Sequence, residues 1–183
     1  MKILKNIKFK IGQRKLRKTV RKPETNAVAC NLYKAKNIGI VFNANLKQDF
    51  DEVNLFIKNL KKQIAIVEAL GYVENDNYEE FHRTNHELKL FNKTDITKFY
   101  KPKSPIVKEF CETEFDILID LNTKDCLPLC FVIAESKALF KTGLYSEKKP
   151  NYYDLMLKIE KNSENIVKNL IIQTEHYLKM INT

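Results

Sequence analysis

The sequence has little glycine and proline and no tryptophan, with four Gly and five Pro among 183 residues. So few chain-breaking residues leave little material for flexible linkers, and we find neither an internal repeat nor a low-complexity tract. The chain is 44% hydrophobic and includes 11 Phe and 8 Tyr. That is enough apolar material for one sizeable core but not for two, so we expect one domain.

Long apolar runs are missing as well. A membrane-spanning helix needs roughly 20 consecutive apolar residues, and residues 1–10 alternate lysine with apolar residues where a secretory signal would have an apolar stretch. We therefore expect a soluble, cytoplasmic protein. The cysteines Cys30, Cys111, Cys126 and Cys130 show no CxxC spacing. We expect them to be reduced and packed in the core, without a disulfide framework.

Acidic residues are nearly absent from the first 36 residues, where Glu24 stands alone against twelve Lys and Arg. The net charge of +9 therefore belongs to this segment, because the remaining residues carry a slight negative excess. Ile3, Ile7 and Ile11 fall at helical spacing before Gly12 interrupts the pattern; Leu16 and Val20 resume it, and Pro23 ends it. We predict a basic amphipathic arm over residues 1–36, helical up to Pro23, and an α/β domain over residues 37–183.

Three interpretations of the arm stay open: it lies on an anionic membrane surface, it contacts RNA phosphates, or it only solubilises the chain. Lysine outnumbers arginine 28 to 4. Lysine suits nonspecific attraction better than bidentate recognition, so sequence-specific DNA binding is not expected. The residues expected to bind an anionic surface are Lys2, Lys5, Lys8, Lys10, Arg14, Lys15, Arg17, Lys18, Arg21 and Lys22.

The rest of the chain alternates strand and helix patterns. Apolar or alternating runs predict strands at residues 37–43, 67–73, 87–91, 115–121, 138–143 and 153–159. Helices are predicted at 49–62, from Pro105 with Ser104 as N-cap, at 126–136 and at 163–180. This alternation predicts a three-layer α/β domain with a mostly parallel sheet of about five or six strands, Rossmann-like or flavodoxin-like, closed by a C-terminal helix.

In open α/β sheets, ligands bind beyond the carboxyl ends of the strands, near the point where the strand order reverses. No glycine-rich loop follows the strand at 37–43, which argues against a dinucleotide or Walker-type site, and we expect no cofactor. Asn122 and Asp125 are also ordinary caps for the next helix, and this structural interpretation is the favoured one. The ligand-binding candidates are Asn43, Asn45, Asp120, Asn122 and Asp125.

Two further pairs of residues have side chains that could bind a metal or take part in catalysis. His82 and His86 stand four residues apart, which is compatible with metal ligation. The polar, irregular sequence around them favours a solvated loop, and we predict no metal site. Ser136 and His176 have no local catalytic signature, so the sequence does not decide whether the protein is an enzyme.

Five strings lie within the predicted elements: residues 38–42 (IGIVF), 70–72 (LGY), 115–121 (FDILIDL), 136–143 (SKALFKTG) and 153–156 (YDLM). Through them, residues 36–181 resemble a bacterial domain-of-unknown-function family of small, Rossmann-like α/β proteins. The resemblance implies the α/β fold and a bacterial cytoplasmic location, and it assigns no functional residue. The shorter stretch 115–143 is similar to the N-terminal half of heptosyltransferase-like sugar transferases, which implies fold alone.

Our leading hypothesis is a non-enzymatic intracellular module whose arm associates with an anionic surface, either the inner face of the membrane or RNA. The alternative is a small enzyme or ligand binder that uses the crevice at the strand ends near Asn43 and Asp120. A third interpretation is a subunit of a homo-oligomer or larger assembly that pairs through the edge strand at 153–159 or the terminal helix.

Overall fold

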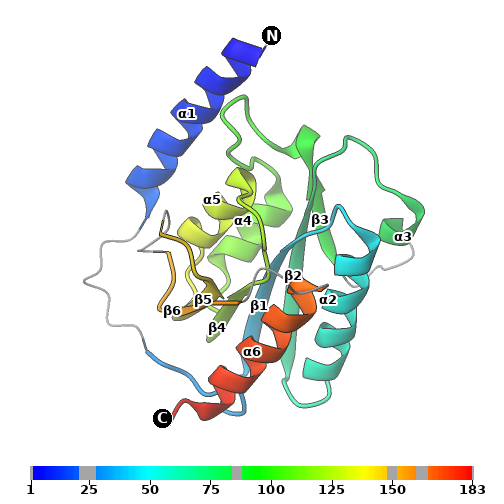
Figure 1. Cartoon of the computed structure of the whole chain (residues 1–183), viewed down its shortest axis with the longest axis vertical. Helices are drawn as coiled ribbons and strands as arrows, with labels where there is room; N and C mark the ends of the chain where they lie inside the picture. Colours follow the sequence, from blue (N-terminus) through cyan, green and yellow to red (C-terminus); the bar gives the residue numbers. More distant parts are fainter. Residues whose placement is uncertain (1, 21–27, 84–87, 148–151, 160–164, 183) are drawn as a thin grey trace.

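A computed structural model describes residues 2–20, 28–83, 88–147, 152–159 and 165–182 of the chain (Figure 1). Within these residues, strands and helices alternate after a first helix. In chain order the elements are α1 (Lys2–Thr19), β1 (Asn37–Asn43), α2 (Lys47–Leu60), β2 (Ile66–Val73), α3 (Glu80–Arg83), β3 (Lys89–Asn92), the 3-10 turn η1 (Lys93–Asp95), α4 (Pro105–Glu112), β4 (Ile117–Asp120), α5 (Leu127–Glu135), β5 (Phe140–Leu144), β6 (Leu155–Leu157) and α6 (Ile166–Met180).

The strands form one six-stranded sheet in the order β3-β2-β1-β4-β5-β6, and each neighbouring pair is parallel. This is the strand order of Rossmann-type doubly wound folds. The predicted α/β class with a parallel sheet is confirmed. β1 occupies the centre, where Ile38, Ile40 and Val41 are fully buried, because helices cover both faces of a parallel sheet.

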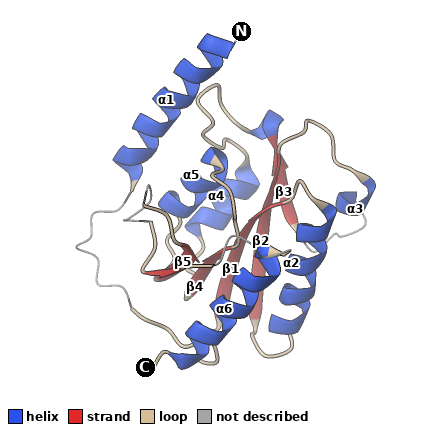
Figure 2. Cartoon of the chain, in the orientation of Figure 1, coloured by secondary structure: helices blue, strands red, loops and turns tan. Residues whose placement is uncertain are grey.

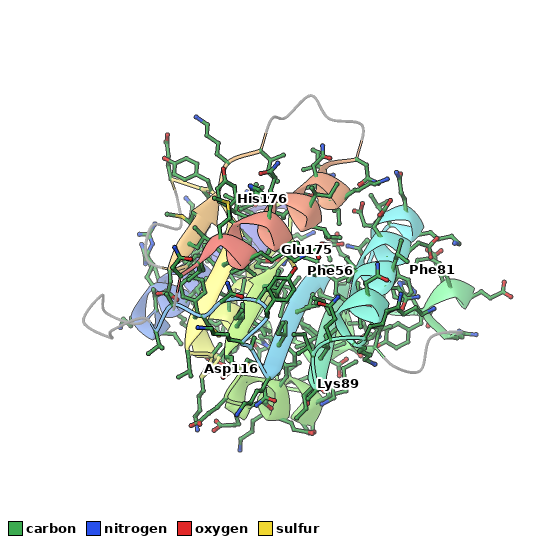
Figure 3. All side chains as sticks on the ribbon, turned by 90° about the horizontal axis from the view of Figure 1, so that it is seen from below. Phe56, Phe81, Lys89, Asp116, Glu175 and His176 are labelled. Carbon is green, nitrogen blue, oxygen red and sulfur yellow. The ribbon has the colours of Figure 1, made fainter. Side chains whose placement is uncertain are left out.

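Helices α2 and α6 cover one face of the sheet, and α4 and α5 cover the other (Figures 2 and 3). Side chains alternate along each strand, so Ile117 and Ile119 of β4 pack toward α2 and α6 while Leu118 packs toward α4 and α5. At the edge of the sheet where β1 and β4 begin, the Asp116 side chain accepts hydrogen bonds from the backbone N–H of Lys36 at 2.7 Å and of Asn37 at 3.0 Å. These bonds join the starts of the two strands (Asp116 is labelled in Figure 3).

Helix α1 runs without a break through Gly12, where the apolar spacing is interrupted. Glycine lets α1 approach the loop after η1 closely, because a Cβ atom on Gly12 would lie 2.4 Å from the backbone oxygen of Phe99. Four residues later, Leu16 is 4% exposed and joins a cluster with Leu127 and Phe131 of α5. The second half of α1 therefore packs on α5, while its first half projects beyond the domain (Figure 1).

Several boundaries differ from the sequence prediction. β6 covers Leu155–Leu157 at the sheet edge, shorter than the predicted 153–159, because the Tyr153 side chain turns into the core. β4 begins at Ile117, where its pairing with β1 starts. The ring of Phe115, just before it, packs against Gly39, where a Cβ would lie 2.7 Å from that ring. The starts predicted at residues 87 and 163 fall outside the described residues.

A buried lysine fixes the end of α5. Lys141 of β5 is 6% exposed, and its ammonium group donates to the backbone oxygens of Ile133 at 2.7 Å and Ser136 at 2.8 Å. The last carbonyls of a helix have no partner within the helix and carry partial negative charge, so a cation there is favourable.

Candidate functional site

The strand order reverses between β1 and β4, whose carboxyl ends point to the same edge of the sheet. Connections leave these two strands toward opposite faces, so a crevice is expected between the turns that follow them. The two turns comprise residues 44–46 and 121–126. Both groups of predicted ligand-binding residues lie here, at the end of β1 and at the end of β4.

Asp120 is the centre of a buried polar cluster at this edge. Its side chain is 2% exposed. One carboxylate oxygen accepts the Tyr153 hydroxyl, and the other accepts the backbone N–H of Asn122 at 2.9 Å and the side-chain amide of Asn122. Burial and the nearby Asp120 carboxylate raise the pKa of the Tyr153 phenol well above its usual value. The phenol therefore keeps its proton and donates a hydrogen bond to Asp120.

Tyr153 reaches Asp120 by crossing β5. A Cβ atom on Gly143 would lie 2.7 Å from the Tyr153 ring, so glycine is needed at this position for the ring to lie against the strand. In the sequence, Tyr153 falls in an alternating pattern that predicts an edge strand, and no local pattern assigns it to the site. Its 33-residue separation from Asp120 left no local signal for the contact.

Asn122 is 6% exposed, and its side-chain oxygen has no hydrogen-bond partner among the described atoms. A buried acceptor without a partner is costly, typically by about 1–3 kcal/mol, and is a common mark of a position that takes a water or ligand donor. The residue at the N-cap of α5 is Cys126, which forms no side-chain cap bond. The expectation that Asn122 or Asp125 caps this helix is therefore wrong.

The two asparagines after β1 bind backbone groups. The Asn43 side-chain oxygen accepts the N–H of Asn45 at 3.1 Å, and the Asn45 side-chain oxygen accepts the N–H of Glu74 at 2.7 Å. These bonds join the turn after β1 to the end of β2. Asp125 is exposed. The structure thus brings Asp120 and Asn122 together, whereas Asn43 and Asn45 bind the backbone of their own turn and of Glu74.

His82 is buried rather than solvated, so the expectation of a solvated loop is wrong for this residue. Its Nδ1 accepts the N–H of Glu79 at 2.9 Å, and its Nε2 lies 2.6 Å from the Ala44 oxygen. Because Nδ1 accepts a hydrogen bond, the proton lies on Nε2, which donates to the Ala44 carbonyl. This hydrogen bond holds α3 against the turn after β1. His86 lies outside the described residues. Within the described part of the chain, no three His, Cys, Asp or Glu side chains are grouped as a metal site would need.

Eight of the ten predicted anionic-surface residues lie on α1, and the seven whose side chains are described are exposed: Lys5, Lys8, Lys10, Arg14, Lys15, Arg17 and Lys18. Of the other three, Lys2 has no described side chain, and Arg21 and Lys22 lie outside the described residues. Apolar residues in the projecting half are exposed as well, with Leu4 at 63%, Ile7 at 48% and Phe9 at 38%.

A hairpin loop after η1 holds α1 in place. Ile96 and Pro102 pair across the loop, and Tyr100 at its tip adopts a left-handed backbone with φ of 67°, a conformation that costs a non-glycine residue energy and needs support from its surroundings. That support includes an edge-on contact between the rings of Tyr100 and Phe9, with centroids 5.6 Å apart. The Lys15 ammonium lies 4.4 Å from the centroid of the Phe99 ring.

The strand order and the helices on both faces of the sheet define a Rossmann-type doubly wound α/β protein. Comparison with family models adds one match: residues 8–181 match a family of unknown function (DUF6913), and the chain belongs to that family. The expected resemblance to a domain-of-unknown-function family is confirmed. The match includes the half of α1 that packs on α5. No curated protein and no solved structure matches the chain.

Among the described helices, none combines the length and apolarity that crossing a bilayer requires.

Proposed function

We propose that this is a bacterial cytoplasmic protein that binds the inner face of the membrane peripherally, through the projecting half of α1. The observation that carries the proposal is an exposed apolar face in a helix without acidic residues. Leu4 and Ile7 are 63% and 48% exposed, although burying an aliphatic side chain is worth about 1.5–3 kcal/mol. A surface that accepts apolar side chains and attracts cations would account for both features.

The exposed apolar face is not the face that packs on the domain. Ile7 and Leu16 are nine residues apart, which is about two and a half helical turns, so they lie on opposite sides of α1. Leu16 is buried against α5, and Leu4 lies one turn before Ile7. The free apolar face therefore remains available while the helix stays docked.

The cations support an anionic surface. The sequence of α1 contains eight Lys and Arg and no acidic residue. Each basic residue near an anionic bilayer contributes about 1 kcal/mol, and lysine provides this attraction without demanding a fixed geometry. An amphipathic helix of this composition lies in the membrane interface with its apolar face toward the acyl chains.

RNA is the less favoured surface for α1. RNA phosphates attract the lysines but make no favourable contact with exposed aliphatic side chains. Single-stranded RNA is bound largely by stacking of its bases on aromatic side chains. The one aromatic residue of α1, Phe9, packs edge-on against Tyr100. A docked helix with a free aliphatic face thus fits a lipid interface better.

The test is cosedimentation of the full chain with phosphatidylglycerol vesicles and with uncharged phosphatidylcholine vesicles across a salt series. We expect binding to the anionic vesicles that weakens as salt rises. The double variant Leu4→Ser/Ile7→Ser should lose at least tenfold in affinity, since it removes the apolar contribution and leaves the charge unchanged. Substitution is sharper than deletion of residues 1–22, which would also uncover the α5 surface beneath Leu16.

The matched control is Ile172→Ser/Met180→Ser on α6, whose apolar side chains are 50% and 59% exposed. This control should bind vesicles as the wild type does. No binding of the wild type to anionic vesicles at low salt would refute the proposal, as would equal binding by the Leu4/Ile7 variant. Salt-sensitive retention on RNA without vesicle binding would assign the helix to RNA instead.

A second candidate function, a small enzyme or ligand binder at the strand-end crevice, is favoured by the unpartnered oxygen of Asn122. The ligand group at this point would be a hydroxyl or amine that donates a hydrogen bond. A thermal-shift screen of polyols, nucleosides and amines tests it. A compound that raises the melting temperature of the wild type but not of Asn122→Ala supports the site, and no such compound argues against it.

A further inference from the structure

A cleft of about 590 Å³ lies on the α4–α5 side of the sheet, away from both sites described above. It is bounded by the end of α1 at Thr19, by the loop residues 101–104, by α4 and by the end of α5. Its volume falls within the range of about 300–1,000 Å³ that is usual for small-molecule sites. Helix α1 packs on α5, and its last residue, Thr19, is the part of α1 that lines this cleft. We call it the α1–α4–α5 cleft.

The floor of the α1–α4–α5 cleft is apolar. Val107 and Cys111 of α4 and Ala134 of α5 line it and are 4%, 6% and 8% exposed. Burial raises the pKa of the Cys111 thiol to about 12, so this side chain stays a neutral, unreactive part of the floor. The floor can therefore accept the apolar body of a ligand but supplies no nucleophile.

The rim is basic, and its acidic residues are already paired. Glu135 pairs with Lys101 at 2.6 Å, and Glu112 pairs with Lys137. Two lysines that line the cleft, Lys103 and Lys108, are exposed and form no ion pair with any described residue. Neither lysine is therefore held in an ion pair, although the charge of Lys108 also acts on the Glu112 carboxylate one turn further along α4.

The remaining polar groups of the rim are donors. Ser104 is the N-cap residue of α4, but its hydroxyl makes no cap bond and is free to turn toward a ligand. The start of α4 adds the positive end of its helix dipole between the two lysines. Because lysine acts as a flexible point charge, this set suits a doubly charged phosphate better than a planar carboxylate.

We propose that the α1–α4–α5 cleft binds a phosphate ester with a small apolar body, with the phosphate held by Lys103 and Lys108 and the apolar part on Val107 and Ala134. The site is independent of the membrane contact of α1, because it uses neither Leu4 nor Ile7. It takes a soluble ligand on the inner side of the helix, whereas the vesicle contact uses the outer side.

The probe is phenyl phosphate, which joins a dianion to an apolar ring, with inorganic phosphate and phenol as its two halves. Binding to the full chain is followed by amide chemical shifts in a titration at constant ionic strength, balanced with chloride. We expect saturable shifts at residues 101–112 and 134–135, with phenyl phosphate binding more tightly than either half. Lys103→Gln/Lys108→Gln should lower the affinity at least tenfold.

The control variant is Lys58→Gln/Lys168→Gln, which removes two exposed lysines from α2 and α6 on the opposite face of the sheet. It lowers the net charge equally and should leave the affinity unchanged. Absence of saturable shifts with phenyl phosphate would overturn the proposal. An equal loss of affinity in both double variants would also overturn it, because the binding would then follow net charge and not this cleft.

Discussion

Replacement of Gly12 by alanine sets two opposing effects against each other. Alanine is about 1 kcal/mol better than glycine in the interior of a helix, so on helix propensity alone the variant would be more stable. The structure predicts the reverse. The new Cβ would lie 2.4 Å from the Phe99 oxygen and 3.0 Å from a methyl carbon of Leu127, whereas nonbonded heavy atoms usually approach to about 3.5 Å.

The clash with Phe99 involves backbone, which cannot move aside as a flexible side chain would. Overpacking of this kind costs about 1–3 kcal/mol. If α1 lifts to avoid it, Leu16, now 4% exposed, loses burial worth about 1.5–3 kcal/mol. Set against the gain in helix propensity, we expect a net loss of about 0.5–2 kcal/mol, which lowers the melting temperature of a domain of this size by about 1–8 °C.

Calorimetry measures this change, and limited trypsin digestion shows where it acts. The basic residues of α1 are trypsin sites, and cleavage within α1 should accelerate in Gly12→Ala while the sheet remains resistant. The neighbouring variant Gln13→Ala, at an exposed position, should change neither measurement. A Gly12→Ala variant that melts higher than the wild type, with unchanged digestion, would refute the packing of α1 on Phe99 and α5.

Three further predictions concern the core. Tyr153→Phe removes a hydrogen bond to the buried Asp120 carboxylate and should lower the free energy of unfolding in urea by about 1.5–3 kcal/mol. The exposed control Tyr177→Phe should leave it unchanged, and equal stability of the two variants would contradict the buried cluster around Asp120. Lys141→Met keeps the apolar stem but removes the donor from the carbonyls of Ile133 in α5 and of its C-cap residue Ser136, so we expect a loss of about 2 kcal/mol, and unchanged stability would contradict that role. The pKa of Cys111 rises from 9.0 to about 12 on folding. Above pH 9 the unfolded chain therefore releases a proton that the folded chain keeps. The free energy of unfolding should fall as the pH rises, by up to about 1.4 kcal/mol per pH unit. Cys111→Ala should remove this part of the slope, and an identical pH dependence would contradict it.

Much of the fold follows from local patterns. The apolar, β-branched run at 37–43 is β1 as predicted, and Ser104 and Pro105 occupy the first positions of α4 as expected. Alternating strand and helix patterns implied the parallel sheet, because parallel strands require crossovers. The strand ends also indicated Asp120 and Asn122, since residues that follow parallel strands meet at one edge.

Contacts between distant residues were not predictable in this way. His82 binds the carbonyl of Ala44, 38 residues earlier in the chain, and its polar neighbours suggested a solvated loop. The pairing of Tyr153 with Asp120 depends on Gly143, which lies on a third element. Periodicity records which face of one element is apolar, but it contains no information about which other element covers that face.

The amino-acid sequence by itself determined the α/β class, the concentration of positive charge in the first 36 residues and the edge of the sheet where ligand-binding residues would lie, because composition and short-range periodicity are local properties. Tertiary structure decided that α1 has one apolar face on α5 and another left free, that Asp120 is buried beneath Tyr153, and that Lys103 and Lys108 line a cleft without being held in ion pairs. Each of these depends on the packing of segments far apart in the chain, since burial and pairing are properties of the folded neighbours and not of the residue itself.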